Sequence, residues 1–383
     1  MDAGVVAAML PWMTRQFGNP HSHTHEIGRL AARACDDAIA SVAAILQTSP
    51  DHVIVTSGAT ESNNLAIDGF MRHPRQKRRR IITSATEHPA VLDPVMRLKK
   101  DGFDVTVMDV RPQGDQRCGQ IDLQRLRETI DDNTALVSIM WANNEIGTVS
   151  PMAEMAQIVH AAGAMLHCDA TQVAGQIPID MVDTDIDLLS LSAHKFYGPM
   201  GIGLLALHPQ KRIRLKPMFE GGGQQQGLRS GTVNVPGLIG MSEALRFVSV
   251  DSDRENDRLR ALRDRLWQRL ETAFPGIELN GPPLADVERE QIRLVNNLNI
   301  SLAEIEGETI MAAAPELAIS SGSACSSVDP RPSHVLMAIG LSESRARRSL
   351  RFGLGRSTTA EDIDDALEML VAAAKKIDAS AML

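Results

Sequence analysis

The feature that most constrains the fold is an alternation of short apolar segments with helical stretches through residues 52–207. Alternating strands and helices of this kind predict a mostly parallel sheet of seven strands. Polar residues follow several of the strands, and open α/β sheets bind ligands at the carboxyl ends of their strands. The predicted strands are residues 52–57, 80–84, 103–110, 135–140, 164–169, 187–192 and 201–207.

The pattern changes near residue 250, where a long charged helix opens at Asp253 and strands follow near 295–302 and 348–354. A capping box from Thr358 to Glu361 starts the last helix. Its apolar face, which is expected to pack on the second domain, consists of Ile363, Leu367, Leu370, Ala374 and Ile377. The length of 383 residues suffices for two domains. We therefore predict a large domain over 1–248 and a smaller α+β domain over 249–383.

Lys195 lies at the end of one of the most apolar strands, between that strand and a glycine-containing turn. A buried ammonium is costly unless it is paired or neutralised, so packing alone does not explain a lysine there. A lysine flanked by Ser192 and His194 suits pyridoxal phosphate (PLP), which needs an amine for a Schiff base and donors for its phosphate. The alternative is a surface lysine that follows a core strand.

Asp169 and the segment after the first strand add to this pattern. Asp169 ends a neighbouring apolar strand, and a carboxylate there would pair with the pyridine nitrogen of PLP. The alternative for Asp169 is a helix N-cap, and both roles are compatible. The segment from Ser57 to Thr60 opens a helix with small residues, so its backbone amides can approach an anion at the helix N-terminus.

A series of motifs in this order closely resembles the cysteine desulfurases of the NifS and IscS type, which are fold type I PLP enzymes of the class V aminotransferase family. The resemblance covers nearly the whole chain, and it includes the subgroup that serves DNA phosphorothioation. The motifs are residues 56–64, Thr86-Glu87-His88, Asn143-Asn144-Glu145-Ile146-Gly147, Asp169-Ala170-Thr171-Gln172, Ser192-Ala193-His194-Lys195, Arg229-Ser230-Gly231-Thr232 and residues 320–325.

The resemblance implies that the enzyme takes sulfur from L-cysteine, leaving L-alanine and a persulfide on Cys325. It implies Lys195, His88 and Cys325 as catalytic residues, and Arg351 with Asn144 as the grip on the substrate carboxylate. Thr232 would reach the phosphate in a neighbouring subunit, which implies a homodimer. The implied cofactor-binding residues are Lys195, Asp169, Gln172, His88, Ala59, Thr60, Ser192, His194, Thr232 and Asn144.

Two of these residues also make chemical sense from the sequence alone. Arg351 alternates with Leu350 and Phe352 as on a half-buried strand, where a carboxylate ligand would satisfy its guanidinium. The alternative for Arg351 is a structural salt bridge. Cys325 lies among small residues with prolines beyond it, so we expect it to move between the cofactor and an acceptor. The alternative for Cys325 is a buried small hydrophobe.

Composition supports a soluble protein of a reducing cytoplasm. The chain has four cysteines and no Cys-x-x-Cys or Cys/His spacing, which argues against a disulfide scaffold and against a metal site. No apolar run is long enough to span a bilayer, and the first residues do not resemble a signal peptide. The net charge of −9 argues against direct nucleic-acid binding. The basic residues 72–80 are expected to form a solvated connection, or otherwise to dock an acidic protein or a phosphate backbone.

Several alternatives stay open at this point. The sulfur acceptor would be an iron–sulfur scaffold, a tRNA-thiolation protein or a DNA phosphorothioation protein. A PLP aminotransferase or selenocysteine lyase would turn over without Cys325. Members of the family usually begin with a further strand and an Ala-Thr-Thr turn ahead of Asp2, so a sulfur-relay protein with weakened catalysis is the third reading. A shorter tail than in some relatives further implies a different acceptor.

Overall fold

The computed structural model describes residues 1–287, 290–321 and 331–381, and the chain divides into two compact units. The first unit consists of Met1–Met108, Leu123–Trp141 and Pro151–Ser252. The second consists of Asp109–Asp122, Ala142–Ser150 and Asp253–Leu383. The predicted domain boundary between residues 248 and 249 stays a prediction.

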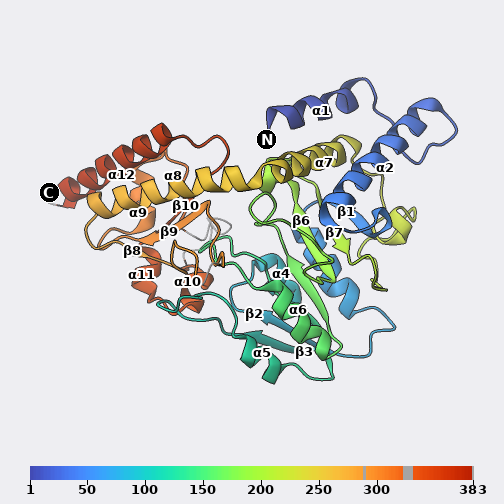
Figure 1. The fold of residues 1–383 in the computed structure, drawn as a ribbon, viewed down its shortest axis with the longest axis horizontal. Coiled ribbons are helices and arrows are strands. Elements are labelled where there is room, and N and C mark those ends of the chain that lie inside the picture. The colour runs from blue at the N-terminus through green and yellow to red at the C-terminus, as the bar shows by residue number, and fades with distance from the viewer. Residues whose placement is uncertain (288–289, 322–330, 382–383) are drawn as a thin grey trace. The chain divides into compact units, whose positions relative to one another are not determined.

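A seven-stranded sheet forms the centre of the first unit (Figure 1). Its strand order is β1-β7-β6-β5-β4-β2-β3, and only β7 runs antiparallel to its neighbours. The prediction of a mostly parallel seven-stranded sheet is therefore confirmed. The strands are β1 (Val53–Thr56), β2 (Arg80–Ser84), β3 (Asp104–Met108), β4 (Thr134–Ser138), β5 (Met165–Asp169), β6 (Leu188–Ser192) and β7 (Gly203–Leu207).

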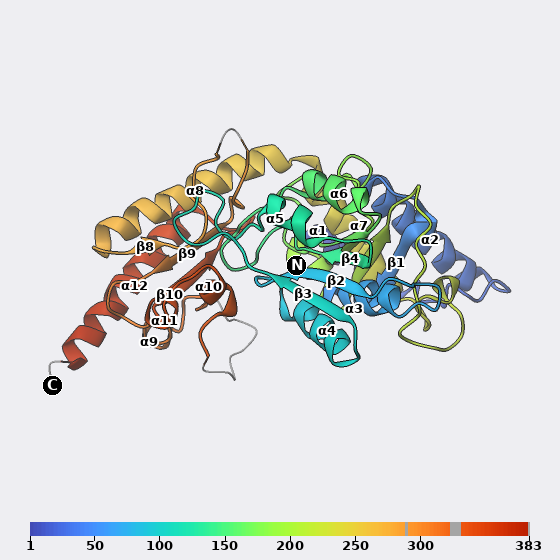
Figure 2. The same ribbon diagram turned by 90° about the horizontal axis from the view of Figure 1, so that it is seen from below.

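Helices cover both faces of this sheet, so four of its strands are buried along their whole length instead of alternating between buried and exposed residues. Every residue of β1, β4, β6 and β7 is buried. In Figure 2, α4 lies on one face of the sheet and α6 on the other. The helices of this unit are α1 (Ala3–Thr14), α2 (Glu26–Leu46), α3 (Ala59–Asn64), α4 (Pro89–Lys100), α5 (Leu123–Thr129), α6 (Met152–Ala161) and α7 (Val235–Val250), with a π-turn at Leu65–Gly69 and short 3-10 turns at Pro50–His52, Ala193–Phe196 and Gln225–Gly227.

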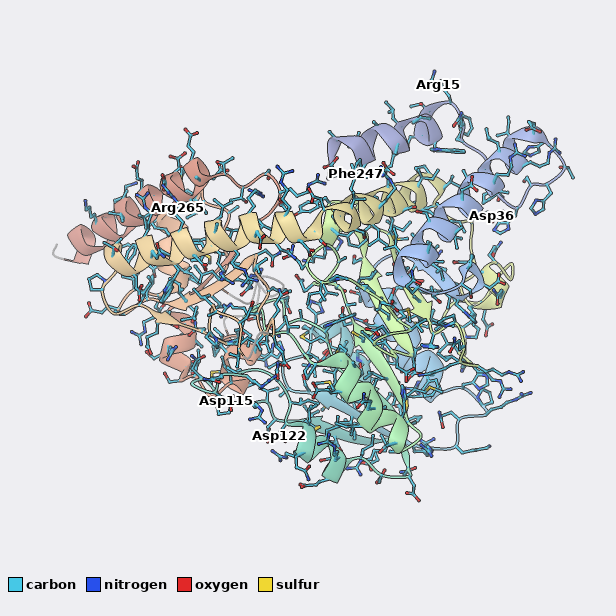
Figure 3. The ribbon with its side chains drawn as sticks, viewed as in Figure 1. Arg15, Asp36, Asp115, Asp122, Phe247 and Arg265 are labelled. Atoms are coloured by element: carbon cyan, nitrogen blue, oxygen red, sulfur yellow. The ribbon has the colours of Figure 1, made fainter. Side chains whose placement is uncertain are left out.

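Helix α1 begins at a capped residue and packs closely on α7. The Asp2 carboxylate accepts a hydrogen bond from the Gly4 backbone N–H at 2.8 Å, which is the usual N-cap arrangement. A Cβ at Gly4 would lie 2.9 Å from the ring of Phe247, which is labelled on α7 in Figure 3. The approach of the two helices therefore depends on a residue without a side chain.

Arginines of the basic run 72–80 bind other parts of the first unit. Arg78 donates hydrogen bonds of 2.7–3.0 Å to the carbonyl oxygens of Thr134, Ala162 and Gly163. Arg80 pairs with Asp131 at 2.7 Å, and the guanidinium of Arg79 lies over the ring of Phe103. Arg78 and Arg80 are therefore structural, which differs from the expected solvated connection.

A three-stranded antiparallel sheet in the order β10-β9-β8 forms the centre of the second unit. Arg265 on α8, labelled in Figure 3, pairs with Asp364 on α12 at 2.7 Å. The elements are α8 (Ser252–Ala273), β8 (Glu278–Leu279), β9 (Asn297–Ser301), α9 (Gly307–Ala313), α10 (His334–Ala338), α11 (Glu343–Arg347), β10 (Ser349–Gly353) and α12 (Ala360–Ala381).

The predicted apolar face of the last helix is confirmed, but its capping box is one residue later than predicted. Ile363, Leu367, Leu370 and Ala374 are buried in the core of the second unit, and Ile377 packs against it. The Thr359 hydroxyl accepts from the Asp362 N–H, and the Asp362 carboxylate accepts from the Thr359 N–H at 2.8 Å. The box therefore joins Thr359 to Asp362 rather than Thr358 to Glu361.

Over the described ranges, no helix combines the length and the apolar content that crossing a bilayer needs.

Candidate active site

The strand register brings the ends of β1 and β6 to one level of the sheet. Thr56 and Ser192 both pair with Gly203 of β7, which runs antiparallel between them. Strands β2, β4 and β5 run parallel to β6, so their carboxyl ends lie at the same edge. The residues that follow these strands therefore gather at one edge, as the sequence predicts for a ligand site in an α/β sheet.

Gly203 allows the helix after β1 to begin close to this edge. A Cβ at Gly203 would lie 2.7 Å from the Cα of Gly58, which is closer than real Cβ atoms approach. Gly58 itself has a φ of +150°, a conformation that L side chains rarely adopt, and it is the N-cap position of α3. An added Cβ at Gly58 would be 3.5 Å from the Ser192 hydroxyl. The two glycines thus place the N-terminus of α3 beside Ser192.

Lys195 follows β6 in a short 3-10 turn, Ala193–Phe196, and its side chain is exposed. It makes no hydrogen bond or ion pair with any residue that the structure describes. The Ser192 hydroxyl and the His194 Nδ1 are 3.0 Å apart. Partial burial and the nearby Lys195 charge lower the pKa of His194, so its neutral ring is favoured. A free amine thus lies beside two groups that can bind an anion.

Asp169 ends β5 and is almost fully buried. One carboxylate oxygen accepts from the Thr171 backbone N–H at 3.0 Å, and the other accepts from the Asn63 side-chain amide at 2.7 Å. The first bond caps a turn, and a side-chain oxygen that accepts from a backbone N–H two residues later is the kind of contact that an N-cap makes. The second bond comes from Asn63 of α3. Sequence reasoning missed Asn63, although it lies in a motif that had been singled out, because its partner belongs to a distant strand.

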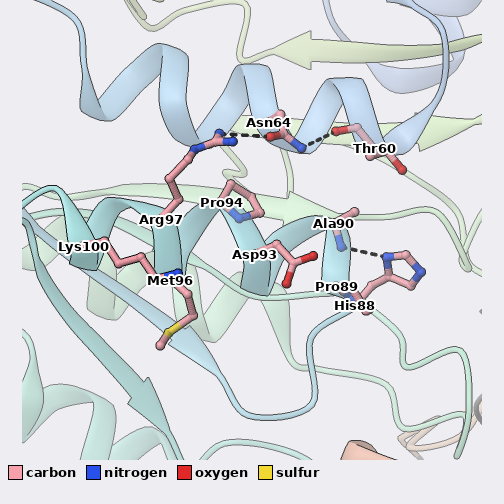
Figure 4. A pocket seen from close by; sticks show the side chains of 10 residues that line it. All are labelled: Thr60, Asn64, His88, Pro89, Ala90, Asp93, Pro94, Met96, Arg97 and Lys100. Carbon is pink, nitrogen blue, oxygen red and sulfur yellow. Dashed lines mark hydrogen bonds between the residues drawn. The ribbon is translucent and has the colours of Figure 1, made fainter. Parts of the chain in front are cut away.

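His88 follows β2 and is the N-cap of α4, where its Nδ1 accepts from the Ala90 N–H at 3.0 Å. An acceptor at Nδ1 leaves the proton of the neutral ring on Nε2. His88 and Thr60 also line a cavity of about 670 Å³ between α3 and α4 (Figure 4). The other lining residues are Asn64, Pro89, Ala90, Asp93, Pro94, Met96, Arg97 and Lys100.

Arg351 and Asn144 both belong to the second unit. Arg351 lies on β10 between buried Leu350 and Phe352 and is itself half-buried, as predicted. Its Nη1 donates to the Asn144 carbonyl oxygen at 2.9 Å. Within the described ranges it forms no ion pair, so the salt-bridge alternative finds no support there. Its remaining N–H groups make no hydrogen bond with the described residues, which leaves donors for a carboxylate ligand.

Comparison with known proteins shows the family of this chain. The aminotransferase class-V family model matches residues 1–366. A cysteine desulfurase IscS of Anaeromyxobacter sp. (strain Fw109-5) is 43% identical over 377 residues, covering 98% of this chain and 90% of that protein. The chain belongs to the cysteine desulfurases of the class-V aminotransferase family. It is therefore a PLP-dependent enzyme, and its fold type I architecture is confirmed.

Two solved structures extend the comparison. A NifS-like protein superposes with a TM-score of 0.88 at 32% identity, covering 98% of this chain and 96% of that one. The structure described as SspA in complex with cysteine has a TM-score of 0.78 at 33% identity and covers 92% and 95% of the two chains. Both support the cysteine desulfurase assignment across nearly the whole chain.

The residues at the sheet edge of this desulfurase fit PLP. Beside the Asp169 carboxylate, the buried Asn63 Oδ1 and Thr171 Oγ1 have no hydrogen-bond partner among the described residues. Such polar atoms are rarely left unsatisfied in a finished protein interior, so a polar group is expected there. An unpaired amine, a buried carboxylate and a glycine-built helix N-terminus are the features that the cofactor requires.

Three other predicted site residues of the desulfurase lie in a turn, in a loop or at a helix end and are half-buried or exposed. Gln172 is half-buried in the turn after β5, and Ala59 is half-buried at the start of α3. Thr232 is exposed between Gln225–Gly227 and α7. Cys325 lies outside the described residues.

The remaining cysteines of the desulfurase are unsuited to nucleophilic attack. Burial raises the pKa of Cys35 to about 11 and that of Cys118 to about 12. Burial also raises the pKa of Cys168 well above its usual value. A thiol reacts as the thiolate, so these three are inert near neutral pH.

The described residues contain no group of three or more His, Cys, Asp or Glu side chains that could hold a metal ion.

Two buried groups behind Asp169 were not foreseen from the sequence. The His167 ring lies between the hydroxyls of Ser138 and Ser190 at 2.8 and 3.0 Å, and burial lowers its pKa to about 4. Glu87 accepts from the Ser84 hydroxyl and the Met140 N–H, both at 2.9 Å. Burial raises the pKa of Glu87 from 4.5 to about 8, and the charge of Asp169 adds to the rise. Both groups are therefore neutral at pH 7.

Glu87 is expected to make the stability of the enzyme fall as pH rises. Because its folded pKa lies above its unfolded value, its contribution is fully present below 4.5 and is lost as pH rises through about 8. Glu87→Gln keeps a carbonyl acceptor and cannot titrate. Thermal unfolding measured across this pH range should show a smaller decline for the variant than for the unmodified protein. Equal declines would contradict the burial of a protonated Glu87.

Proposed function

We propose that PLP binds at the carboxyl edge of the seven-stranded sheet through Lys195. The observation that carries this proposal is the strand register: the last residues of β1 and β6 both pair with Gly203 of β7. Strand β5, which ends at Asp169, pairs with β6 on its other side. Asp169 would pair with the pyridine nitrogen, and His88 would stack on the ring. Ala59, Thr60, Ser192 and His194 hold the phosphate, while Gln172 and Asn144 contact the cofactor.

PLP, when bound, supplies an electron sink for bonds at the α-carbon of an amino acid. The chain's own residues then hold and move protons. Lys195 would accept or donate a proton at its Nζ beside the substrate. His88 offers its Nε2 for acid–base steps, because its Nδ1 is engaged by the Ala90 N–H.

We assign the substrate carboxylate to Arg351 and the side chain of Asn144. The guanidinium is held by one hydrogen bond to the Asn144 carbonyl, which orients it without using its other donors. L-cysteine is the substrate, in agreement with the family and with the cysteine bound in the SspA complex.

Cys325 is the proposed sulfur acceptor within the chain. Its thiolate attacks the sulfur of the substrate, and an S–S bond forms as the C–S bond breaks. The electron pair of the broken bond stays with the substrate carbon, which takes up a proton and becomes the methyl group of L-alanine. The persulfide on Cys325 is then passed to an acceptor protein for iron–sulfur cluster assembly, tRNA thiolation or DNA phosphorothioation.

The assembly and the compartment complete the proposal. Thr232 is exposed at the start of the segment before α7, consistent with a hydroxyl that reaches the phosphate of a second copy in a homodimer. A chemistry that depends on a free thiolate and a persulfide favours a reducing cytoplasm.

The proposal is tested by incubating the PLP-loaded protein with L-cysteine and a thiol reductant and measuring both products. We expect equal amounts of L-alanine and sulfide over many turnovers. Formation of 3-mercaptopyruvate, the 2-oxo acid of cysteine, would instead indicate an aminotransferase, and turnover restricted to selenocysteine would indicate a selenocysteine lyase.

Arg351→Lys is expected to raise KM for L-cysteine roughly 10- to 100-fold, because one ammonium cannot replace two parallel N–H donors to a carboxylate. The value of kcat should change less than KM. Arg348→Lys is a matched control, since Arg348 is a neighbouring arginine that donates to the Ser344 carbonyl. An unchanged KM in Arg351→Lys would remove Arg351 from the substrate site.

A further inference from the structure

Glu145 is a buried carboxyl group in the second unit to which the proposed mechanism gives no role. It is 5% exposed and follows Asn144 directly. Burial raises the pKa of Glu145 to about 7, while a hydrogen bond from Ser333 and the charge of Arg351 oppose the rise. A buried ionisable group is costly, so its presence calls for a reason.

Three hydrogen bonds with asparagine side chains hold the backbone of Glu145. Its carbonyl oxygen accepts from the side-chain amides of Asn297 and Asn299, both at 3.1 Å, and both belong to β9. Its N–H donates to the Asn143 side-chain oxygen at 2.8 Å. The loop that presents Asn144 is therefore anchored to the sheet of the second unit.

The side chain of Glu145 binds the start of α10. The Ser333 hydroxyl donates to Glu145 Oε2 at 2.5 Å, and Ser333 is 4% exposed. The same hydroxyl accepts from the Leu336 N–H at 3.2 Å, which makes Ser333 the N-cap of α10. Because the hydroxyl proton goes to Glu145, its lone pairs remain available for the cap.

Arg351 binds the chain on the other side of Cys325, at Ser320. Its backbone exchanges hydrogen bonds with Ser320, with the Arg351 N–H 2.6 Å from the Ser320 carbonyl oxygen. Ser320 and Ser333 stand on either side of residues 322–330 in the sequence, and Cys325 lies between them. Ser320 is thus bound to Arg351. Ser333 is bound to Glu145, in the loop whose Asn144 carbonyl accepts from Arg351.

We infer that Glu145 is a positioning residue for sulfur transfer, acting through its hydrogen bond to Ser333. This inference rests on the proposed roles of Cys325, Arg351 and Asn144. Glu145 ties the chain that follows Cys325 to the loop that carries Asn144. Loss of the tie affects the transfer step, because sulfur transfer needs the attacking thiolate and the substrate sulfur in one geometry. The grip on the substrate carboxylate remains, because Arg351 keeps its own bond to Asn144.

The test uses the PLP-loaded protein and the variants Ser333→Ala and Glu145→Gln. Ser333→Ala should lower kcat for alanine formation about 10-fold, while KM for L-cysteine stays within about 2-fold and the cofactor absorbance is unchanged. Glu145→Gln keeps an acceptor for Ser333 and should lose less. In the double variant, the Glu145→Gln effect should disappear, because both residues act through one hydrogen bond.

Ser342→Ala is the matched control. Ser342 caps α11 by accepting from the Arg345 N–H at 3.2 Å, so this variant also removes a serine cap from a five-residue helix of the second unit. Its kcat should equal that of the unmodified protein. An equal loss in Ser342→Ala, an unchanged kcat in Ser333→Ala, or losses that multiply in the double variant would overturn the inference. If the unmodified protein itself forms no alanine, the proposed function fails instead.

Discussion

Lys195→Ala is expected to abolish alanine formation, with a loss of at least about 1,000-fold in kcat. In the proposed site, Lys195 supplies both the covalent attachment of the cofactor and a proton carrier next to the substrate. Among the residues that the structure describes, no other lysine follows a strand at this edge of the sheet. The variant protein should also lose the visible absorbance of lysine-bound PLP. Activity assays and absorbance spectra of the reconstituted proteins measure both effects.

Lys216→Ala is the control for that experiment. Lys216 is an exposed lysine beyond β7, and its backbone N–H bonds to the Gly69 carbonyl, so its side chain can be removed without loss of that bond. This variant should keep its absorbance and its activity. Full activity in Lys195→Ala would contradict the assignment of the cofactor lysine.

Cys325→Ser is expected to lower alanine formation by at least about 100-fold while leaving the cofactor bound. A serine hydroxyl stays protonated near neutral pH and is a poor nucleophile toward sulfur, so the C–S bond of the substrate persists. The absorbance of the cofactor should still change when L-cysteine is added, because substrate binding does not use Cys325. Mass spectrometry should find no added sulfur on the variant.

Cys35→Ala provides the control for the thiol. Cys35 is buried in α2 among alanines, and its raised pKa makes it inert. Replacing it should leave both the alanine yield and the persulfide unchanged. Undiminished turnover in Cys325→Ser would point to a reaction without an enzyme-bound persulfide, as in a selenocysteine lyase.

The strands and the edge of the sheet were predictable from the sequence because they depend on local properties. Long apolar runs identified β1, β6 and β7, and the polar residues after β1 and β6 marked the edge. The capping box was misplaced because two adjacent threonines, Thr358 and Thr359, both have an acid three residues later. Thr358 instead accepts from the Gly355 N–H through its hydroxyl, which leaves the cap to Thr359.

The supporting polar network could not be predicted, because its partners are distant in the sequence. Asn63 reaches Asp169 only through the packing of α3 on the sheet, and Glu145 reaches Ser333 only through the fold of the second unit. Arg78 looked like one more surface charge in a basic run, yet three carbonyl oxygens bind it. Such contacts depend on strand register and helix placement, which single-residue patterns do not encode.

The most direct test of the cofactor site is borohydride reduction of the PLP-loaded protein followed by peptide mass mapping. Borohydride fixes the cofactor permanently to the lysine that carries it. We predict a single modified peptide with the added mass on Lys195. Modification of another lysine, such as Lys211 or Lys216, or no modification at all, would contradict the placement of PLP at the carboxyl edge of the sheet.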